Sequence, residues 1–350
     1  MVVCCPGSEP LTILAKEGVT QGDPLSMIVY GVMVSYIATR MEKDAPTVHQ
    51  SWFADDLAAL GDMKSLEEFM SKLTAMGPAY GYFPELEKST VIAAEVNHEA
   101  VRKRTGGSIG VKAGAQYVGT FLGDECERDK WVIEQVEQWR SELQSLVVVA
   151  HREPQAAYCL FTKALSAKWT YMQRVCPGVG HLFEPLEEII RDRLIPTIVL
   201  GCKDDEVPEV FCSILSLSVR EGSAAFWDPT LTAERQHRAS MEATLVLVEA
   251  LQTKSDLSIA QHKEHCWHAK SKAQIAQQTK DAAERKEAIE GVPLAPKRKV
   301  LEQAPTNGAW LTATPCTLNG TVLTAGEFRD GLVMRFGLTP MDLPDRCNGC

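Results

Sequence analysis

The sequence predicts an α+β protein in which a mixed first part is followed by a helical remainder. Before about residue 125, short β-strand candidates and Gly-rich turns alternate with amphipathic helices. From about Glu127 onward, apolar residues recur at alternating steps of four and three, which is the period of a helix. The 350 residues, 45% hydrophobic and 23% charged, exclude a disordered, collagen-like or disulfide-scaffold protein and suffice for about two or three units.

The first part opens with a turn-rich loop that leads into a helix. The loop EGVTQGDPLS at residues 17–26 contains Asp23-Pro24, and proline is tolerated at the first position of a helix. We therefore predict a helix from this point to about Met41. In the next segment, SWFADDLAAL, apolar stretches flank an acidic pair, which predicts a β-hairpin with Asp55 and Asp56 at or near its turn.

A second helix and two short strands complete the mixed part. Ser65-Leu66-Glu67-Glu68 has the pattern of a capping box, and Gly77-Pro78 ends the helix that follows it. Strands are predicted at Thr90–Ala94 and Gln116–Leu122. The predicted helix carries one apolar stripe, made of Leu66, Phe69, Met70, Leu73 and Met76.

The helical remainder begins with a long amphipathic helix. Two further helices are predicted, from Pro154 to about Arg174 and over Leu186–Leu194. Residues Ser255–Gly291 are rich in Ala, Gln, Lys and Glu and predict a long, mostly solvated helix. The stripe of the first helix consists of Val132, Val136, Trp139, Leu143, Leu146 and Ala150.

The charge is acidic in total but unevenly distributed. A formal net charge of -10 argues against a protein that coats nucleic acid with a uniformly basic surface. Residues 1–100 contain fourteen Asp or Glu against six Lys or Arg, whereas Lys254–Glu302 contains seven against ten. The 11 scattered Cys residues and the lack of a signal peptide or membrane-length apolar run predict an intracellular protein, nuclear or cytoplasmic and not secreted, with no membrane partner.

The adjacent pair Asp55-Asp56 is the strongest chemical signal. Two like charges held together repel, and a divalent cation relieves that repulsion. Carboxylate oxygens suit Mg²⁺ or Mn²⁺, ions that position and neutralise phosphates in phosphoryl transfer. An acidic pair is also common in surface turns, because turns are enriched in Asp. The pair alone leaves both interpretations open.

The sequence around the pair resembles the palm of reverse transcriptases, in particular those of non-LTR retrotransposons. Phe53-Ala54-Asp55-Asp56 resembles their catalytic hairpin, and Gly18–Ser26 resembles the loop and helix before it. Gly81–Pro84 with Lys88-Ser89 resembles the lysine-bearing motif after the hairpin, and Tyr117-Val118-Gly119 the strand that leads toward the primer grip. The four motifs stand in the family's order over about 110 residues, and later stretches are similar to retroelement proteins as well.

The resemblance implies a fold and an activity. The fold would be a partial polymerase palm, an antiparallel sheet with packed helices, over residues 1–125. A mostly helical thumb (126–200), a helical connection with the long polar helix (201–292) and a C-terminal helical extension (293–350) would follow. The activity would be RNA-templated DNA synthesis. The partners would be an RNA template, a DNA primer and dNTP, and the resemblance does not indicate an oligomeric state.

It also implies roles for particular residues. Asp55 and Asp56 would be catalytic and hold Mg²⁺ or Mn²⁺. Lys88 would be catalytic near the phosphates, although it also fits an ordinary surface lysine. The positions expected near the template and nucleotide are Gly18, Gln21, Gly22, Pro24 and Phe53.

The sequence departs from the family at one essential point. The family uses a further aspartate on a strand well upstream of the loop, and only Glu9 and Glu17 precede the loop here. We therefore expect a reverse-transcriptase domain truncated at both ends and inactive by itself. The alternative is a catalytically dead retroelement remnant that binds RNA or protein; a metal-dependent nuclease ranks last, because it lacks further carboxylates and a general base.

Two other groups of residues could bind metal. Cys347 and Cys350 form an incomplete zinc knuckle, which would need two more ligands beyond the last residue. The segment QHKEHCWHAK contains His262, His265 and His268, but helical spacing divides its ligands between two faces. We interpret it as a histidine-rich helix surface with Trp267 packed beneath.

Overall fold

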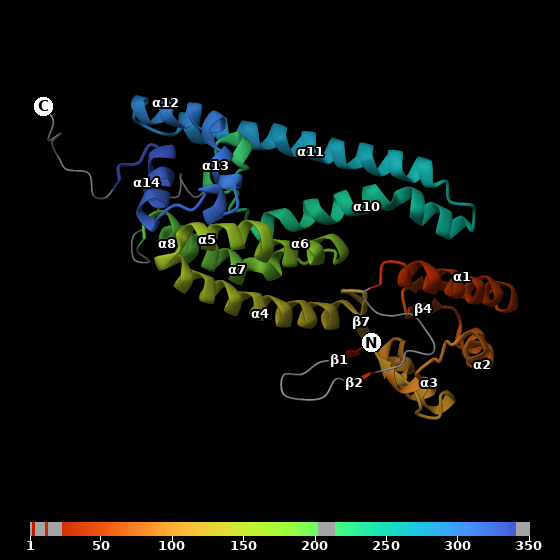
Figure 1. The fold of residues 1–350 in the computed structure, drawn as a ribbon. Helices are drawn as coiled ribbons and strands as arrows, with labels where there is room; N and C mark the ends of the chain where they lie inside the picture. Colours follow the sequence, from red (N-terminus) through yellow and green to blue (C-terminus); the bar gives the residue numbers. More distant parts are fainter. Residues whose placement is uncertain (1, 4–10, 13–22, 202–213, 341–350) are drawn as a thin grey trace, which may run out of the picture. The chain divides into compact units, whose positions relative to one another are not determined.

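The computed structural model describes residues 2–3, 11–12, 23–201 and 214–340. The chain divides into two compact units, Met1–Asp124 and Glu125–Cys350 (Figure 1). The first unit combines helices with short two-stranded sheets, and the second unit is mainly helical. The predicted α+β class is confirmed. None of the described helices is long and apolar enough to span a membrane.

The first unit contains the hairpin and its supporting helices. The first predicted helix is α1, which ends three residues later than expected, and the acidic hairpin is formed by β3 and β4. The elements in order are β1 (Val2–Val3), β2 (Leu11–Thr12), α1 (Ser26–Asp44), β3 (His49–Phe53), β4 (Asp56–Leu60), α2 (Met63–Met76), β5 (Thr90–Ile92), α3 (His98–Arg104), β6 (Gly110–Lys112), β7 (Gly114–Tyr117) and β8 (Thr120–Gly123). Three-residue and four-residue 3-10 turns at Gly77–Tyr80, Leu86–Lys88 and Glu95–Asn97 connect them.

The strands of this unit differ from the predicted antiparallel sheet. In the described residues they form separate pairs, and only three of these, β1–β2, β3–β4 and β7–β8, are antiparallel. Strands β5 and β6 are parallel, with Thr90 opposite Gly110. Parallel strands need a crossover connection, and the segment containing α3 provides it.

Two local predictions in this unit were wrong. Helix α2 begins at Met63, two residues before the predicted capping box, because Asp62 is the N-cap and accepts hydrogen bonds from the amides of Lys64 and Ser65. The Ser65 hydroxyl donates to Asp62 instead of capping a helix end. The strand predicted at 116–122 is the hairpin β7–β8, because Val118 and Gly119 adopt positive φ angles and reverse the chain.

A small core holds the first unit together. The apolar stripe predicted for α2 is confirmed, since Phe69 and Leu73 are fully buried and the other three members pack against the same cluster. Helix α1 contributes Ile37 and Met41 from one of its faces. The hairpin contributes Trp52 and Leu57, which are half-buried. The acidic turn is therefore attached to a packed layer of two helices.

The second unit is helical throughout its described length. Its elements are α4 (Glu125–Arg152), α5 (Pro154–Leu160), α6 (Ser166–Val175), α7 (Glu184–Ile189), α8 (Ile195–Val199), α10 (Pro229–Thr253), α11 (Ile259–Glu290), α12 (Ala295–Gln303), α13 (Ala309–Thr312) and α14 (Ala325–Arg335). Short π-helical turns at Phe161–Leu165 and Ile190–Leu194 join α5 to α6 and α7 to α8. The helices predicted from Pro154 and over Leu186–Leu194 therefore correspond to continuous helical segments.

The core of the second unit is extensive and aromatic. All six residues of the stripe predicted for α4 are buried. Trp139 of that helix lies within 6.5 Å, centroid to centroid, of both Trp169 and Phe183. Tyr158 is buried as well, and its hydroxyl donates to the carbonyl of Ala224 at 2.9 Å. This packing confirms the helical period read from residue 127 onward.

Helices α10 and α11 form a long antiparallel pair (Figure 1). Lys254, at the C-cap of α10, has a left-handed backbone conformation that helps to reverse the chain. The ion pair between Lys272 and Glu242 (2.8 Å) joins the two helices. Among the residues of α11, only Ala269, Asp281 and Ile289 are buried. The prediction of a long, mostly solvated helix is confirmed.

Candidate functional site at the Asp55-Asp56 hairpin

The acidic pair lies at the tight end of the hairpin β3–β4. Phe53 and Asp56 are paired in the ladder, so the connecting loop consists of Ala54 and Asp55 alone. Two-residue loops match the twist of antiparallel strands when a loop residue has a positive φ, and Ala54 has a φ of +52°. Asp55 thus occupies the loop and Asp56 opens β4, with both side chains exposed.

A chain of polar contacts ties the hairpin to α1. The indole Nε1 of Trp52 donates to Oε1 of Gln50 at 3.0 Å. The amide Nε2 of Gln50 in turn donates to the carbonyl oxygen of Ala38 in α1 at 2.8 Å. The Trp52 ring also meets the ring of Tyr82 edge-on, with centroids 5.4 Å apart. The hairpin that carries the acidic turn is therefore held by a backbone carbonyl of α1 and by the ring of Tyr82.

Two tyrosines lie in the electrostatic field of the pair. Burial raises the pKa of Tyr30, and the Asp55 carboxylate raises that pKa further. Burial likewise raises the pKa of Tyr82, with smaller contributions from Tyr30, Asp55 and Asp56. Both phenols therefore stay protonated at neutral pH and can donate hydrogen bonds beside the carboxylates. Sequence reasoning missed both residues.

Lys88 forms an ion pair with a neighbouring glutamate. It ends the 3-10 turn Leu86–Lys88, where its Nζ lies 2.6 Å from a carboxylate oxygen of Glu85, and both side chains are largely exposed. A hydrogen bond from the ammonium to Glu85 raises the pKa of Lys88. The spacing of three residues between Glu85 and Lys88 was a readable signal for this pair.

The remaining predicted site residues are only partly described. Pro24 is exposed in the turn before α1, where Oδ1 of Asp23 accepts a hydrogen bond from the Leu25 amide at 2.8 Å. Phe53 is 60% exposed at the end of β3. Other predicted positions lie outside the described residues, namely Gly18, Gln21, Gly22, Cys347 and Cys350.

The pair offers part of a metal site. Its adjacent carboxylates supply hard oxygen ligands, and Mg²⁺ is commonly held by one or two carboxylates together with substrate phosphates. Over residues 2–3, 11–12, 23–201 and 214–340, no group of three or more His, Cys, Asp or Glu side chains could hold a metal ion. The donor chemistry of Asp55 and Asp56 therefore fits a metal whose other ligands come from water or a phosphate.

Within that described part, the histidine-rich segment of α11 does not bring three or more His, Cys, Asp or Glu side chains together around a common point. Nε2 of His265 lies 2.9 Å from the carbonyl oxygen of Glu242 in α10, whereas His268 is exposed. The prediction that Trp267 packs beneath the segment was wrong, because Trp267 is 64% exposed and Ala269 occupies the buried position.

No protein-family model, curated protein or solved structure matches the chain. The residues and their geometry therefore carry the functional argument.

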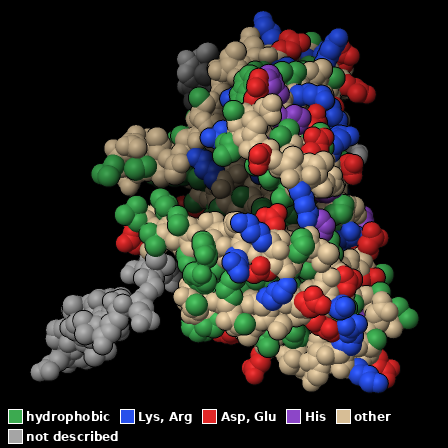
Figure 2. All heavy atoms as spheres, turned by 90° about the vertical axis from the view of Figure 1, so that its right-hand side faces the viewer, with side chains coloured by type: hydrophobic (Ala, Val, Ile, Leu, Met, Phe, Trp, Pro, Cys, Tyr) green, Lys and Arg blue, Asp and Glu red, His purple; other side chains and the backbone are tan. Residues whose placement is uncertain are grey.

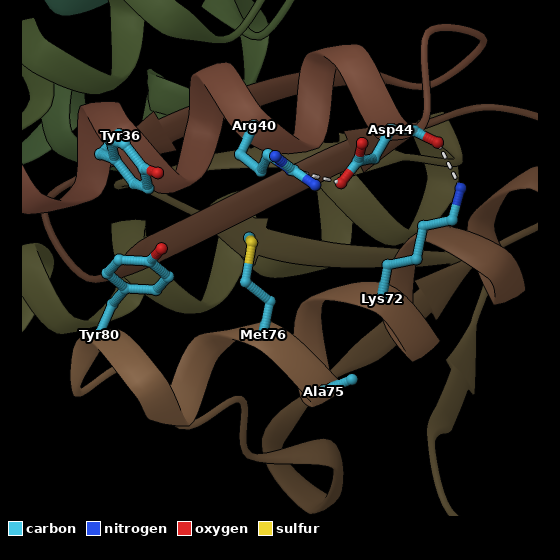
Figure 3. Close-up of a pocket in the computed structure, with 7 residues that line it drawn as sticks. All are labelled: Tyr36, Arg40, Asp44, Lys72, Ala75, Met76 and Tyr80. Atoms are coloured by element: carbon cyan, nitrogen blue, oxygen red, sulfur yellow. Dashed lines mark hydrogen bonds and ion pairs between the residues drawn. The ribbon is translucent and has the colours of Figure 1, made fainter.

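Two grooves that sequence reasoning did not find also lie on the described surface. The first, of about 460 Å³, is lined by residues of α1, α2 and the following turn (Figure 3). In it the rings of Tyr36 and Tyr80 face each other with centroids 5.1 Å apart, and Arg40 pairs with Asp44 at 3.0 Å. Lys72 donates to the carbonyl oxygen of Asp44. The groove's cations are thus largely engaged by groups of the chain itself.

The second groove, of about 390 Å³, is acidic and lies in the second unit. Its lining includes Glu184, Glu187 and Glu188 of α7, together with Asp228 at the start of α10. Burial, assisted by the charge of Asp228, raises the pKa of Glu187 to about 7. One of its carboxylate oxygens is buried without a hydrogen-bond partner. Asp228 is occupied as the N-cap of α10, where it accepts from the amides of Thr230 and Leu231.

Proposed function

We propose that the chain is a reverse-transcriptase-domain polypeptide of the non-LTR retrotransposon type. The observation that carries the proposal is the two-residue turn of β3–β4, which presents Asp55 and Asp56 side by side. The first unit would be part of a polymerase palm, and α4 to α8 would form a helical thumb. The partners would be an RNA template, a DNA primer and dNTP.

In this proposal the chain's own residues prepare a site for a nucleotide–metal complex. Asp55 and Asp56 would hold Mg²⁺ or Mn²⁺, which supplies charge neutralisation and alignment of phosphates. The neutral phenols of Tyr30 and Tyr82 lie near the carboxylates and support them without adding charge. Phe53 exposes an apolar ring for a base or sugar at the end of β3. To contact a phosphate, Lys88 would have to leave its ion pair with Glu85. That exchange would cost little, because an exposed ion pair is weak.

Two carboxylates alone predict weak metal binding and no polymerisation. A two-metal nucleotidyl transfer needs ligands that bridge both ions, and the described residues place no third carboxylate, histidine or cysteine with the pair. We therefore expect residues 1–350 by themselves to bind metal together with dNTP but not to extend a primer.

Electron paramagnetic resonance of Mn²⁺ tests the proposal on the purified chain. We expect one Mn²⁺ to bind more tightly when dNTP is present, because the phosphates complete its coordination. Asp55→Asn with Asp56→Asn should remove this dNTP-dependent binding. The matched control is Glu67→Gln with Glu68→Gln, which removes another adjacent acidic pair from the same unit and should leave the binding unchanged. Mn²⁺ binding that is equally insensitive to both double variants would contradict the proposal. Mg²⁺-dependent primer extension by the chain would contradict only the expectation that residues 1–350 are inactive by themselves.

A specific observation favours the alternative of a module that only binds RNA or protein. The segment Lys254–Glu302 carries more Lys and Arg than Asp and Glu, although the whole chain is acidic. RNA binding that weakens with added salt and survives Asp55→Asn with Asp56→Asn, without dNTP-dependent Mn²⁺ binding, would favour this alternative.

A further inference from the structure

The outer face of α1 is apolar and exposed. No charged residue occurs between Pro24 and Thr39. Met27 is 63% exposed on another side of the helix. Five other apolar side chains that are more than half exposed recur at steps of three and four residues and therefore lie on one face of the helix. They are Leu25, Ile28, Val29, Val32 and Tyr36, with exposures of 64%, 63%, 57%, 67% and 56%. We call these five residues the α1 stripe.

The opposite face of α1 is also apolar, and it is already occupied. Val34, Ile37 and Met41 are buried, the last two in the core shared with α2 and the hairpin. A surface helix of a globular protein normally opposes its buried face with charged and polar residues, and a helix that is apolar all round is normally buried. Single exposed apolar residues are ordinary, but a continuous stripe marks an interaction surface.

Exposed apolar side chains also occur elsewhere on the described surface. Figure 2 shows acidic and basic side chains of both signs intermixed over the face that it presents, with hydrophobic side chains in groups between them. Other exposed apolar residues include Val96, Val148 and Leu318, which belong to separate elements. The α1 stripe combines five exposed apolar side chains on α1 and its N-cap residue Leu25, over about 17 Å at 1.5 Å per residue.

The charges at the two ends of the stripe complement each other. Asp23 is exposed just before the helix, and Arg40 and Lys43 are exposed in its last turns. Asp23 and Lys43 stand ten residues on either side of Met33, which is next to Val32 of the stripe. Two such helices packed antiparallel would place Asp23 of each against Lys43 of the other, and their helix dipoles would also oppose favourably.

We propose that the α1 stripe docks on the α1 stripe of a second copy of this chain, antiparallel and about a two-fold axis near Val32. Such a contact is isologous, since the same patch is used by both copies. A single helix pair buries much less than a standard interface, so the dimer is reversible, with a dissociation constant on the order of micromolar. The inference is independent of the function proposed for Asp55 and Asp56.

Sedimentation equilibrium of the full chain, over a concentration range spanning both sides of the micromolar value, tests this proposal. Val32→Glu should weaken the dimer at least about tenfold, because the two-fold axis brings the two new carboxylates together. The matched control is Val148→Glu, since Val148 is a helical valine with a similar exposure of 70%. Circular dichroism of both variants checks that each keeps its helices. A chain that stays monomeric at all concentrations, or a dimer equally insensitive to both variants, would overturn the proposal.

A charge exchange tests the antiparallel orientation. Asp23→Lys and Lys43→Glu should each weaken the dimer, and the two together should restore it, because the pairs reform with reversed sign. Failure of the combined variant to recover would overturn the antiparallel arrangement. Flotation with anionic and neutral lipid vesicles tests whether the stripe binds a lipid surface instead of a second copy. A chain that stays monomeric and binds vesicles in a manner that Val32→Glu abolishes would overturn self-docking.

Discussion

Ala54 determines the shape of the acidic turn at the scale of single residues. Its φ of +52° is unfavourable for a residue with a Cβ atom, yet the two-residue loop requires it. The position before Asp55 therefore stores local backbone strain, and the packed hairpin maintains it.

Ala54→Gly should stabilise the chain by about 0.5 to 1 kcal/mol, because glycine adopts positive φ without the steric cost. Urea denaturation followed by circular dichroism measures the change. The same substitution at Ala58, inside β4, should instead destabilise by a similar amount, since glycine weakens an extended strand. Equal destabilisation by both variants would show that the strain at Ala54 is absent.

Glu187 gives the chain a pH-dependent stability. Its pKa rises from 4.5 to about 7 in the folded state, mainly through burial. The unfolded chain therefore loses this proton at lower pH than the folded chain, so stability decreases as the pH rises from about 4.5 to about 7.

Glu187→Gln should stabilise the chain at pH 8 by about 1 to 2 kcal/mol, after a discount for the partial exposure of the side chain, and by much less at pH 4. Urea midpoints at the two pH values measure the difference. Glu188→Gln, on the exposed side of the same helix, serves as control and should show a smaller dependence. A Glu187→Gln effect independent of pH would contradict the raised pKa.

At the scale of secondary-structure elements, the helices with a long apolar period were predictable. In α4 the apolar residues from Val132 to Ala150 recur at helical spacing over many turns, and such a long period distinguishes a helix from a strand. The short strands were harder to predict. Strand β5 pairs with β6, which follows it in the chain only after α3, and no local sequence pattern indicates such a pairing. The acidic pair could be located by its motif, but its proximity to Tyr30 and Tyr82 arises from tertiary packing.

The start of α2 shows how two local signals compete. Ser65 with Glu68 has the capping-box spacing, yet Asp62 caps the helix because it accepts from two backbone amides and from the Ser65 hydroxyl. Asp62→Ala should therefore lower the urea midpoint more than Ser65→Ala. The hydrogen bonds to Ser65 hold the pKa of Asp62 below its ordinary value, so this stabilisation is lost as the pH falls through that lowered pKa. A larger effect of Ser65→Ala would restore the capping box predicted from sequence.

At the scale of the whole molecule, the two units have unequal cores. The main cluster of the second unit runs from Val132 to Phe336 and contains residues of that unit alone. The core of the first unit has six buried members, from Ile37 to Leu73. Because stability grows with the apolar surface removed from water, the second unit is the better candidate for independent folding.

We predict that the isolated segment 125–350 folds cooperatively. Its near-ultraviolet circular dichroism should retain the signal of packed aromatic residues, since Trp139 contacts both Trp169 and Phe183 within the segment. Its urea midpoint should match the more stable transition of the full chain. The isolated segment 1–124 should unfold at lower urea, because its core is small. A segment 125–350 that kept helical content but lost the near-ultraviolet signal would show that its core requires residues of the first unit.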